Sequence, residues 1–172
     1  MDAGIAITLE QMLDAREKRA KKQMSLIKEY KLPLVSFTVN IPGMYKNTPV
    51  SRKIFSAGCE ALREKLDASG SLPVYFEQQQ LDTGYEAYAI VDKDAVELKT
   101  NMLEIESTHP LGRLFDIDVI GLNGISITRV ELGYPKRTCL ICGQDAHACS
   151  RSRNHSVEEL TIKINNIVAA YI

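Results

Sequence analysis

Two aspartates, Asp116 and Asp118, stand two residues apart in an apolar stretch that follows a proline and a glycine. Residues at i and i+2 of an extended strand point to the same side, so the two carboxylates are expected to lie together. Adjacent like charges among residues that favour burial are costly unless a cation neutralises them. The pattern favours Mg²⁺, which binds one or two carboxylates together with substrate phosphates in nucleotidyl-transferring enzymes. The alternative is a strand face turned to solvent.

A second group of residues in the C-terminal third has the types that bind zinc. The four residues, at short spacings, are Cys139, Cys142, Cys149 and His155. A CxxC pair followed by a further cysteine and a histidine predicts a structural Zn²⁺ site. The alternative is that Cys149 is buried as a small hydrophobic residue of a short helix beginning at Ala146.

Basic residues at two places could bind anions. Lys46 and Arg52 flank Thr48-Pro49, where a helix is expected to begin, and the free N–H groups of a helix N-terminus attract phosphate. The alternative is two exposed basic residues beside a helix cap. Within the segment Leu9–Tyr30, a run of basic residues could face an acidic carrier protein or simply solvent: Arg16, Lys18, Arg19, Lys21 and Lys22.

The elements that position these residues follow from apolar periodicity and turn signals. Helices are predicted from Leu9 to about Tyr30, from Pro49 to about Gly70, after Asp92 or Asp94 up to Pro110, and from Ser156 onward. Strands are predicted over Leu34–Asn40, Val74–Leu81, Tyr85–Val91, Leu114–Ile120 and, after the Asn123-Gly124 turn, Ile125–Thr128. This order predicts an α+β fold, a mainly antiparallel sheet of about five strands with helices packed on its faces.

Length and composition limit the class of protein. The chain has 172 residues, 45% of them hydrophobic and 25% charged, which predicts a single domain spanning residues 1–172. Its net charge of -1 argues against binding to a nucleic acid polymer. We expect a cytoplasmic protein without membrane attachment, because no signal peptide or run of 18 apolar residues is found. The four cysteines are too few for a disulfide scaffold.

Four blocks carry a family resemblance across nearly the whole chain. They are PLVSFTVNIPG (33–43), RKIFSAGCEALR (52–63), HPLGRLFDIDVIG (109–121) and RTCLICGQDAHACSRSRNHSVEEL (137–160). In this order and spacing they resemble the citrate lyase phosphoribosyl-dephospho-CoA transferase family, the holo-acyl-carrier-protein synthases of citrate lyase. The resemblance implies transfer of phosphoribosyl-dephospho-CoA from triphosphoribosyl-dephospho-CoA to a serine of the citrate lyase acyl carrier (gamma) subunit, with release of pyrophosphate.

This reaction implies roles for the acidic residues and a histidine. Asp116 and Asp118 would hold Mg²⁺, and Glu106 or His109 would accept the serine proton. Alternatively, His109 only caps the preceding helix. The Gly-Arg before the Asp-x-Asp strand resembles the polymerase-β-type nucleotidyltransferase arrangement, without its usual Gly-Ser. A third metal-binding carboxylate is missing from the next predicted strand, which leaves Glu106 or Glu131.

The basic residues would bind the donor. Arg113, Lys46 and Arg52 are assigned to its phosphates, and Gly112 and Arg129 complete the predicted substrate-binding set. Two other functions fit the same residues: a non-catalytic, zinc-stapled adaptor for an acidic carrier protein, and an Asp-x-Asp metal-dependent phosphodiesterase. The adaptor would bind the carrier without consuming nucleotide, and the phosphodiesterase would release products without modifying a protein.

Overall fold

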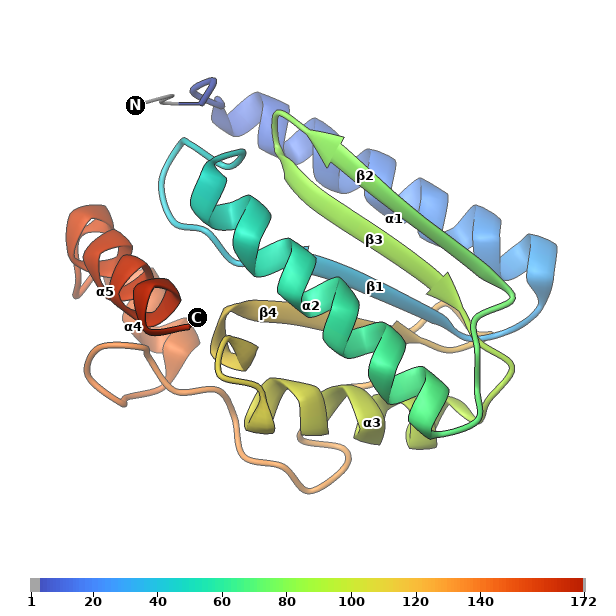
Figure 1. Cartoon of the computed structure of the whole chain (residues 1–172). Coiled ribbons are helices and arrows are strands. Elements are labelled where there is room, and N and C mark those ends of the chain that lie inside the picture. The colour runs from blue at the N-terminus through green and yellow to red at the C-terminus, as the bar shows by residue number, and fades with distance from the viewer. Residues whose placement is uncertain (1–3, 172) are drawn as a thin grey trace.

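The computed structural model describes residues 4–171, and its strands are interspersed with helices along the chain (Figure 1). The helices are α1 (Leu9–Tyr30), α2 (Pro49–Ala68), α3 (Ala95–Thr108), α4 (Ala146–Ser152) and α5 (Val157–Ala170). The strands are β1 (Leu34–Val39), β2 (Tyr75–Leu81), β3 (Gly84–Ile90) and β4 (Phe115–Ile120). Among the described helices, none has the length and apolar character needed to cross a membrane.

The four strands form one antiparallel sheet in the order β2-β3-β1-β4. Helix α1 packs on one face against β1 and β3, whereas α2 and α3 cover the opposite face (Figure 1). Helix α5 packs against α2 beyond the sheet. The predicted α+β class with a mainly antiparallel sheet is therefore confirmed.

The predicted fifth strand is wrong. Asn123-Gly124 does form a turn, but the chain after it makes only an isolated bridge, between Ile120 and Ser126. At the outer edge of β4, side chains instead form hydrogen bonds with the backbone. Glu106 accepts the N–H of Ile117, while Lys99 donates to the carbonyl of the same residue. These contacts occupy positions that a fifth strand would need, and they protect an otherwise open sheet edge.

The sheet face under α2 and α3 forms the main core. Phe37 and Phe115 of this face meet edge to face with ring centroids 5.4 Å apart, and Phe37 stacks on Phe55 of α2. Gly58 of α2 lies so close to Phe37 that a Cβ atom would come within 2.3 Å of its ring. This face therefore depends on close packing of apolar side chains, which fixes the position of β4 relative to α2 and α3.

The sheet face under α1 changes from apolar to polar along the strands. Strand pairing places three rows of residues across β3, β1 and β4 on this face. From the apolar end, the rows are Ile90–Leu34–Ile120, Tyr88–Ser36–Asp118 and Glu86–Thr38–Asp116. The first row packs under Leu26 and Ile27 of α1. The predicted carboxylate pair therefore lies at the polar end of a sheet face.

The predicted helix starts are confirmed. Thr8, Thr48 and Ser156 each cap a helix through a capping box, in which the hydroxyl accepts an N–H and the third helical residue returns a hydrogen bond. Pro49 stands in the first turn of α2. These caps fix where α1, α2 and α5 begin, and so where the loops that border the site emerge.

Candidate functional site

Asp116 and Asp118 lie side by side on the α1 face of β4, as the sequence predicts, and both are exposed. The Ser126 hydroxyl donates to Asp118 at 3.4 Å, and within residues 4–171 neither carboxylate forms an ion pair. Desolvation by surrounding groups and the charge of Asp116 raise the pKa of Asp118 above its usual value. The pair is thus an uncompensated concentration of negative charge, which a bound cation would stabilise.

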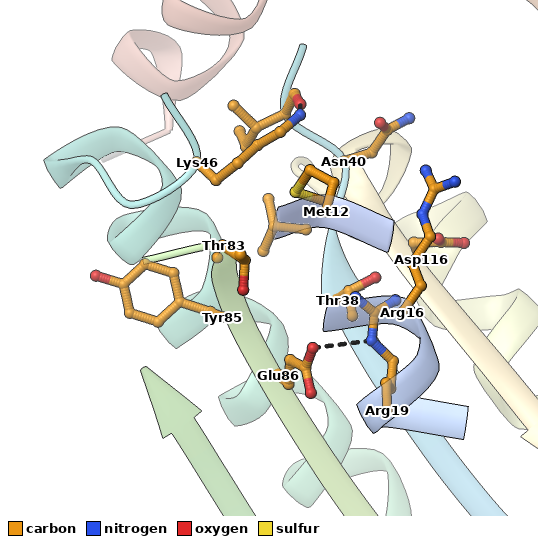
Figure 2. Close-up of a pocket in the computed structure, with 13 residues that line it drawn as sticks. Met12, Arg16, Arg19, Thr38, Asn40, Lys46, Thr83, Tyr85, Glu86 and Asp116 are labelled. Atoms are coloured by element: carbon orange, nitrogen blue, oxygen red, sulfur yellow. Dashed lines mark hydrogen bonds and ion pairs between the residues drawn. The ribbon is translucent and has the colours of Figure 1, made fainter. Parts of the chain in front are cut away.

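A small polar pocket joins Asp116 to side chains from four other segments (Figure 2). Its volume is about 130 Å³. Among its lining residues are Arg16 and Arg19 of α1, Lys46 of the loop before α2, Glu86 of β3 and Asp116 of β4. The pocket therefore combines cations with carboxylates on the polar half of the α1 face.

Two of these charges neutralise each other. Arg19 Nε donates to the buried Glu86 carboxylate at 2.9 Å, and the Tyr88 hydroxyl donates to the same carboxylate. A buried, hydrogen-bonded ion pair of this kind fixes both partners in place, because separating them would leave a charge without compensation. We therefore regard Arg19–Glu86 as the link that holds α1 over the sheet beside Asp116.

The other two cations are not neutralised in this way. Lys46 donates through Nζ to the carbonyl of Ile41 at 2.5 Å, and its pKa is lowered by burial and by the charge of Arg16. In the described part of the chain, neither Lys46 nor Arg16 forms an ion pair. Two cations that repel each other beside one pocket would gain from a bound anion.

The remaining predicted substrate-binding residues do not line this pocket. Arg52 Nε donates to the Tyr85 hydroxyl at 3.1 Å, so it lies behind a side chain that does line the pocket. Arg113 donates to the carbonyl of Thr138. Gly112 allows close packing against α3, since a Cβ there would come within 2.3 Å of the Glu106 carbonyl oxygen. These contacts give all three residues local partners around the pocket, and their predicted role in binding the donor stays a prediction.

Glu106 is held in a charge network at the outer edge of β4. Its carboxylate is buried and accepts the N–H of Ile117 at 3.1 Å. Arg129 lies 2.8 Å and Arg137 2.7 Å from its two oxygens. Burial lowers the pKa of Lys99, which donates to the Ile117 carbonyl within this network. Glu106 and Arg129 therefore pair with each other in this network, and their predicted roles in the reaction stay predictions.

His109 and Glu131 also have local partners. His109 Nδ1 accepts the N–H of Leu111, and its ring packs against Phe115 and Tyr171. Since Phe115 and Asp116 are successive strand residues, that ring contact lies across β4 from the Asp116 side chain. Glu131 accepts the N–H and hydroxyl of Thr128 at 2.6 Å in an exposed turn. Neither residue lines the polar pocket.

Part of the basic run on α1 faces inward, which was not predicted from the sequence. Arg16 and Arg19 line the pocket together with Met12, and this i, i+4, i+7 spacing marks one face of a helix. By contrast, Lys18 and Lys21 form exposed pairs with Asp14 and Glu17. The spacing relative to Met12 is the signal that could have separated the pocket residues from the solvated ones.

The four predicted zinc ligands come together near the C-terminus. Their ligand atoms all lie within 4.8 Å of one another. The Cys149 sulfur is 3.5 Å from that of Cys139 and 3.9 Å from that of Cys142. A tetrahedral zinc site with Zn–S bonds of about 2.3 Å places its sulfurs roughly 3.8 Å apart. The geometry therefore fits a structural zinc ion.

Two local features support metal binding at this cluster. The His155 Nε2 atom is buried and has no hydrogen-bond partner in the described structure, which is costly unless a ligand occupies it. Around Cys139, burial raises the pKa of the thiol, but hydrogen bonds from the amides of Cys142 and Ile141 and from neighbouring thiols outweigh this and lower it to about 6. The thiolate that zinc requires is thus favoured.

The cluster is tied to β4 by two arginines. Arg137, two residues before Cys139, donates to the Phe115 carbonyl at 2.6 Å and pairs with Glu106. Arg113 contacts Thr138, the residue immediately before Cys139. The folded cysteine cluster therefore contacts the outer edge of β4, the strand that carries the two aspartates on its α1 face.

An acidic pair beside unpaired cations on an α+β scaffold is typical of enzymes that transfer phosphate-bearing groups. The family model described as apo-citrate lyase phosphoribosyl-dephospho-CoA transferase matches residues 7–171. The chain belongs to this family and is a transferase.

Two relatives carry the same name, probable apo-citrate lyase phosphoribosyl-dephospho-CoA transferase. A protein of Vibrio cholerae serotype O1 (strain ATCC 39541 / Classical Ogawa 395 / O395) is 40% identical over 168 residues, which cover 97% of this chain and 94% of the relative. One from Streptococcus pyogenes serotype M18 (strain MGAS8232) is 39% identical over 174 residues, covering 98% of this chain and 89% of the relative. The family match over residues 7–171 spans the segments that form both the polar pocket and the cysteine cluster.

Proposed function

We propose that this transferase moves phosphoribosyl-dephospho-CoA from triphosphoribosyl-dephospho-CoA to a serine of the citrate lyase acyl carrier (gamma) subunit. The serine oxygen forms a bond to the phosphorus attached to the ribose, the bond from that phosphorus to the next phosphate breaks, and pyrophosphate leaves. The observation that carries this proposal is the pocket in which Asp116 lies beside Arg16 and Lys46, two cations that form no ion pair within residues 4–171.

Asp116 and Asp118 are the residues that would hold Mg²⁺. The metal ligands fit this ion, because they are two adjacent carboxylate groups whose charges are uncompensated within the described chain. When bound, the ion would neutralise phosphate charge. Arg16 and Lys46 would bind phosphate oxygens that the carboxylates alone would repel.

The proton of the serine must be accepted by a group near the reacting oxygen. Of the two carboxylates that line the pocket, Glu86 is held by Arg19 and Tyr88. We therefore assign the serine proton to Asp116, through the carboxylate oxygen that the ion would leave free. Glu106 and His109 have local partners elsewhere, and their predicted role as base stays a prediction that substitution of each residue would test.

A structural zinc ion at Cys139, Cys142, Cys149 and His155 completes the proposal. It would keep Arg113 and Arg137 against the outer edge of β4, since both arginines flank the cluster or contact its first loop. Zinc would therefore contribute to the folding free energy rather than to the transfer step.

The test is the intact mass of the carrier subunit after incubation with this protein, the donor and Mg²⁺. We expect a gain equal to one phosphoribosyl-dephospho-CoA group, with one pyrophosphate released per carrier, and no gain for a carrier whose acceptor serine is alanine. Donor consumption without a mass gain would indicate a phosphodiesterase. Carrier binding without donor consumption would indicate an adaptor.

A further inference from the structure

A second hollow, which we call the α5 groove, lies next to the polar pocket and is lined mainly by apolar side chains. Ile41, Met44 and Tyr45 form one wall, and Val157, Thr161 and Asn165 of α5 contribute to the other. Its volume is about 530 Å³. Small-molecule sites are commonly about 300–1,000 Å³ and mostly apolar, so the α5 groove has the size and lining of a ligand site.

The donor needs such a site, because the polar pocket is too small to hold it. A volume of about 130 Å³ has room for a metal ion and some phosphate oxygens only. The dephospho-CoA end of the donor contains an adenine ring and a pantetheine chain, which are joined through a ribose and a diphosphate. The ring and the chain carry apolar surface that can be buried, while the diphosphate can stay in solvent. This end must therefore lie outside the pocket, against surface that can bury it.

The α5 groove is continuous with the polar pocket at Ile41. This residue lines both hollows, and its carbonyl accepts the hydrogen bond from Lys46 Nζ. A ligand whose phosphates contact Lys46 could therefore extend along residues 41–45 into the α5 groove. The junction fits a ligand that places a phosphate group at Lys46 and an adenine ring or pantetheine chain in the α5 groove.

The apolar side chains around the α5 groove are unusually accessible. Met44, Tyr45 and Val157 are 53%, 44% and 52% exposed. Tyrosine offers an aromatic face on which a nucleobase can stack, and methionine adapts its shape to a ligand. Three large exposed apolar residues at one junction indicate a surface that becomes buried when a ligand binds.

A rival hollow of about 450 Å³ lies between α1 and the β2–β3 hairpin. It also borders the polar pocket, but its cations are already paired: Lys18 with Asp14, Lys22 with Glu77 and Arg19 with Glu86. Binding there would require the donor to displace internal ion pairs and to place apolar groups against charges. Binding in the α5 groove requires neither the loss of an ion pair nor the burial of apolar groups against charges.

We propose that the α5 groove binds the dephospho-CoA end of the donor. This inference rests on the proposed function, because it requires the donor's phosphates to occupy the polar pocket that adjoins the α5 groove. It adds a second binding region, built from residues 41–45 and α5, to the site formed by the sheet.

The test compares two tryptophan substitutions on α5, Thr161→Trp and Ile162→Trp. Thr161 lines the α5 groove, and its hydroxyl donates only to the Val157 carbonyl of the same helix. Its neighbour Ile162 is 54% exposed and does not line the groove, which makes it the matched control. Calorimetric titration with 3′-dephospho-CoA should give the same Kd for the parent and Ile162→Trp, and at least a tenfold higher Kd for Thr161→Trp, equivalent to about 1.4 kcal/mol.

Three outcomes would overturn the inference. The first is that the parent does not bind dephospho-CoA at millimolar concentration. The second is that both variants and the parent bind it with equal affinity. The third is that Thr161→Trp raises the KM for the carrier while its binding of dephospho-CoA is unchanged. The last would make the α5 groove a protein-docking surface. Conversely, dephospho-CoA binding that Thr161→Trp weakens, together with absent carrier modification by the parent, would overturn the proposed function and leave the ligand site in place.

Discussion

The two chemically rich regions of this protein lie against the same strand and differ in how far their charges are satisfied. On the α1 face of β4, Asp116 and Asp118 have no ion-pair partner in the described chain. Asp116 lines a pocket with two cations, Arg16 and Lys46, that have no such partner there either. At the outer edge, Glu106 is matched by Arg129 and Arg137, beside a compact cluster of zinc-binding residue types.

This difference separates a site for ligands from a site for structure. A satisfied buried network fixes one arrangement, whereas uncompensated charges at a pocket gain from a bound ligand. Residue types alone do not make this distinction, since both regions contain carboxylates and arginines.

The largest expected effect is on catalysis by the aspartate pair. Asp116→Asn and Asp118→Asn should each lower turnover in carrier modification by about a hundredfold or more, about 3 kcal/mol, because charge stabilisation of the transition state is lost. Asp67→Asn, at an exposed position near the end of α2, should retain normal turnover. Activity within threefold of the parent in either pair variant, or turnover independent of Mg²⁺, would remove the catalytic role.

The next effect is on stability and concerns the cysteine cluster. We expect about one zinc per chain by elemental analysis, and loss of zinc in His155→Ala with a fall in melting temperature of roughly 10 °C, as for a loss of several kcal/mol. His147→Ala is the matched control, because His147 is exposed in the same segment and lies outside the cluster. Equal melting temperatures and zinc contents in the two variants would contradict a structural zinc site.

A smaller effect is expected from the cations of α1. Arg16→Ala should raise the KM for the donor by about tenfold, or 1.4 kcal/mol, because one charge-assisted phosphate contact is lost. Lys18→Ala, two residues away and paired with Asp14 on the solvent side, should change this KM by less than twofold. If both variants weaken donor use equally, the effect comes from general charge and not from the polar pocket.

The smallest effect concerns the pH dependence of stability. Because the folded-state pKa of Asp118 is raised, its ionised form is disfavoured on folding, and the resulting cost appears as the pH rises through the carboxyl range. Without metal, Asp118→Asn should therefore melt a few degrees higher than the parent at neutral pH, and this difference should vanish near pH 3, below the ordinary carboxyl pKa. Saturating Mg²⁺ should raise the melting temperature of the parent only. A variant that is less stable at neutral pH would show that the pair is not repulsive.

The sequence by itself determined the local elements and the two residue clusters. Capping residues such as Thr48 and Ser156, and the apolar periodicity that follows them, fixed the helices, because these signals act within a few residues. The two-residue period placed Asp116 and Asp118 on one side of a strand, and the short spacings of Cys139, Cys142, Cys149 and His155 indicated a common site.

Only the tertiary structure decided which distant charges meet. The sequence does not show that Glu106 and Arg129 would pair with each other instead of facing the aspartates, since that depends on how α3 packs against the edge of β4. The same packing replaced the predicted fifth strand with side-chain contacts to Ile117. Arg16 reached the pocket through the placement of α1 over the sheet, because long-range packing, and not local spacing, sets which face of a helix covers which strand.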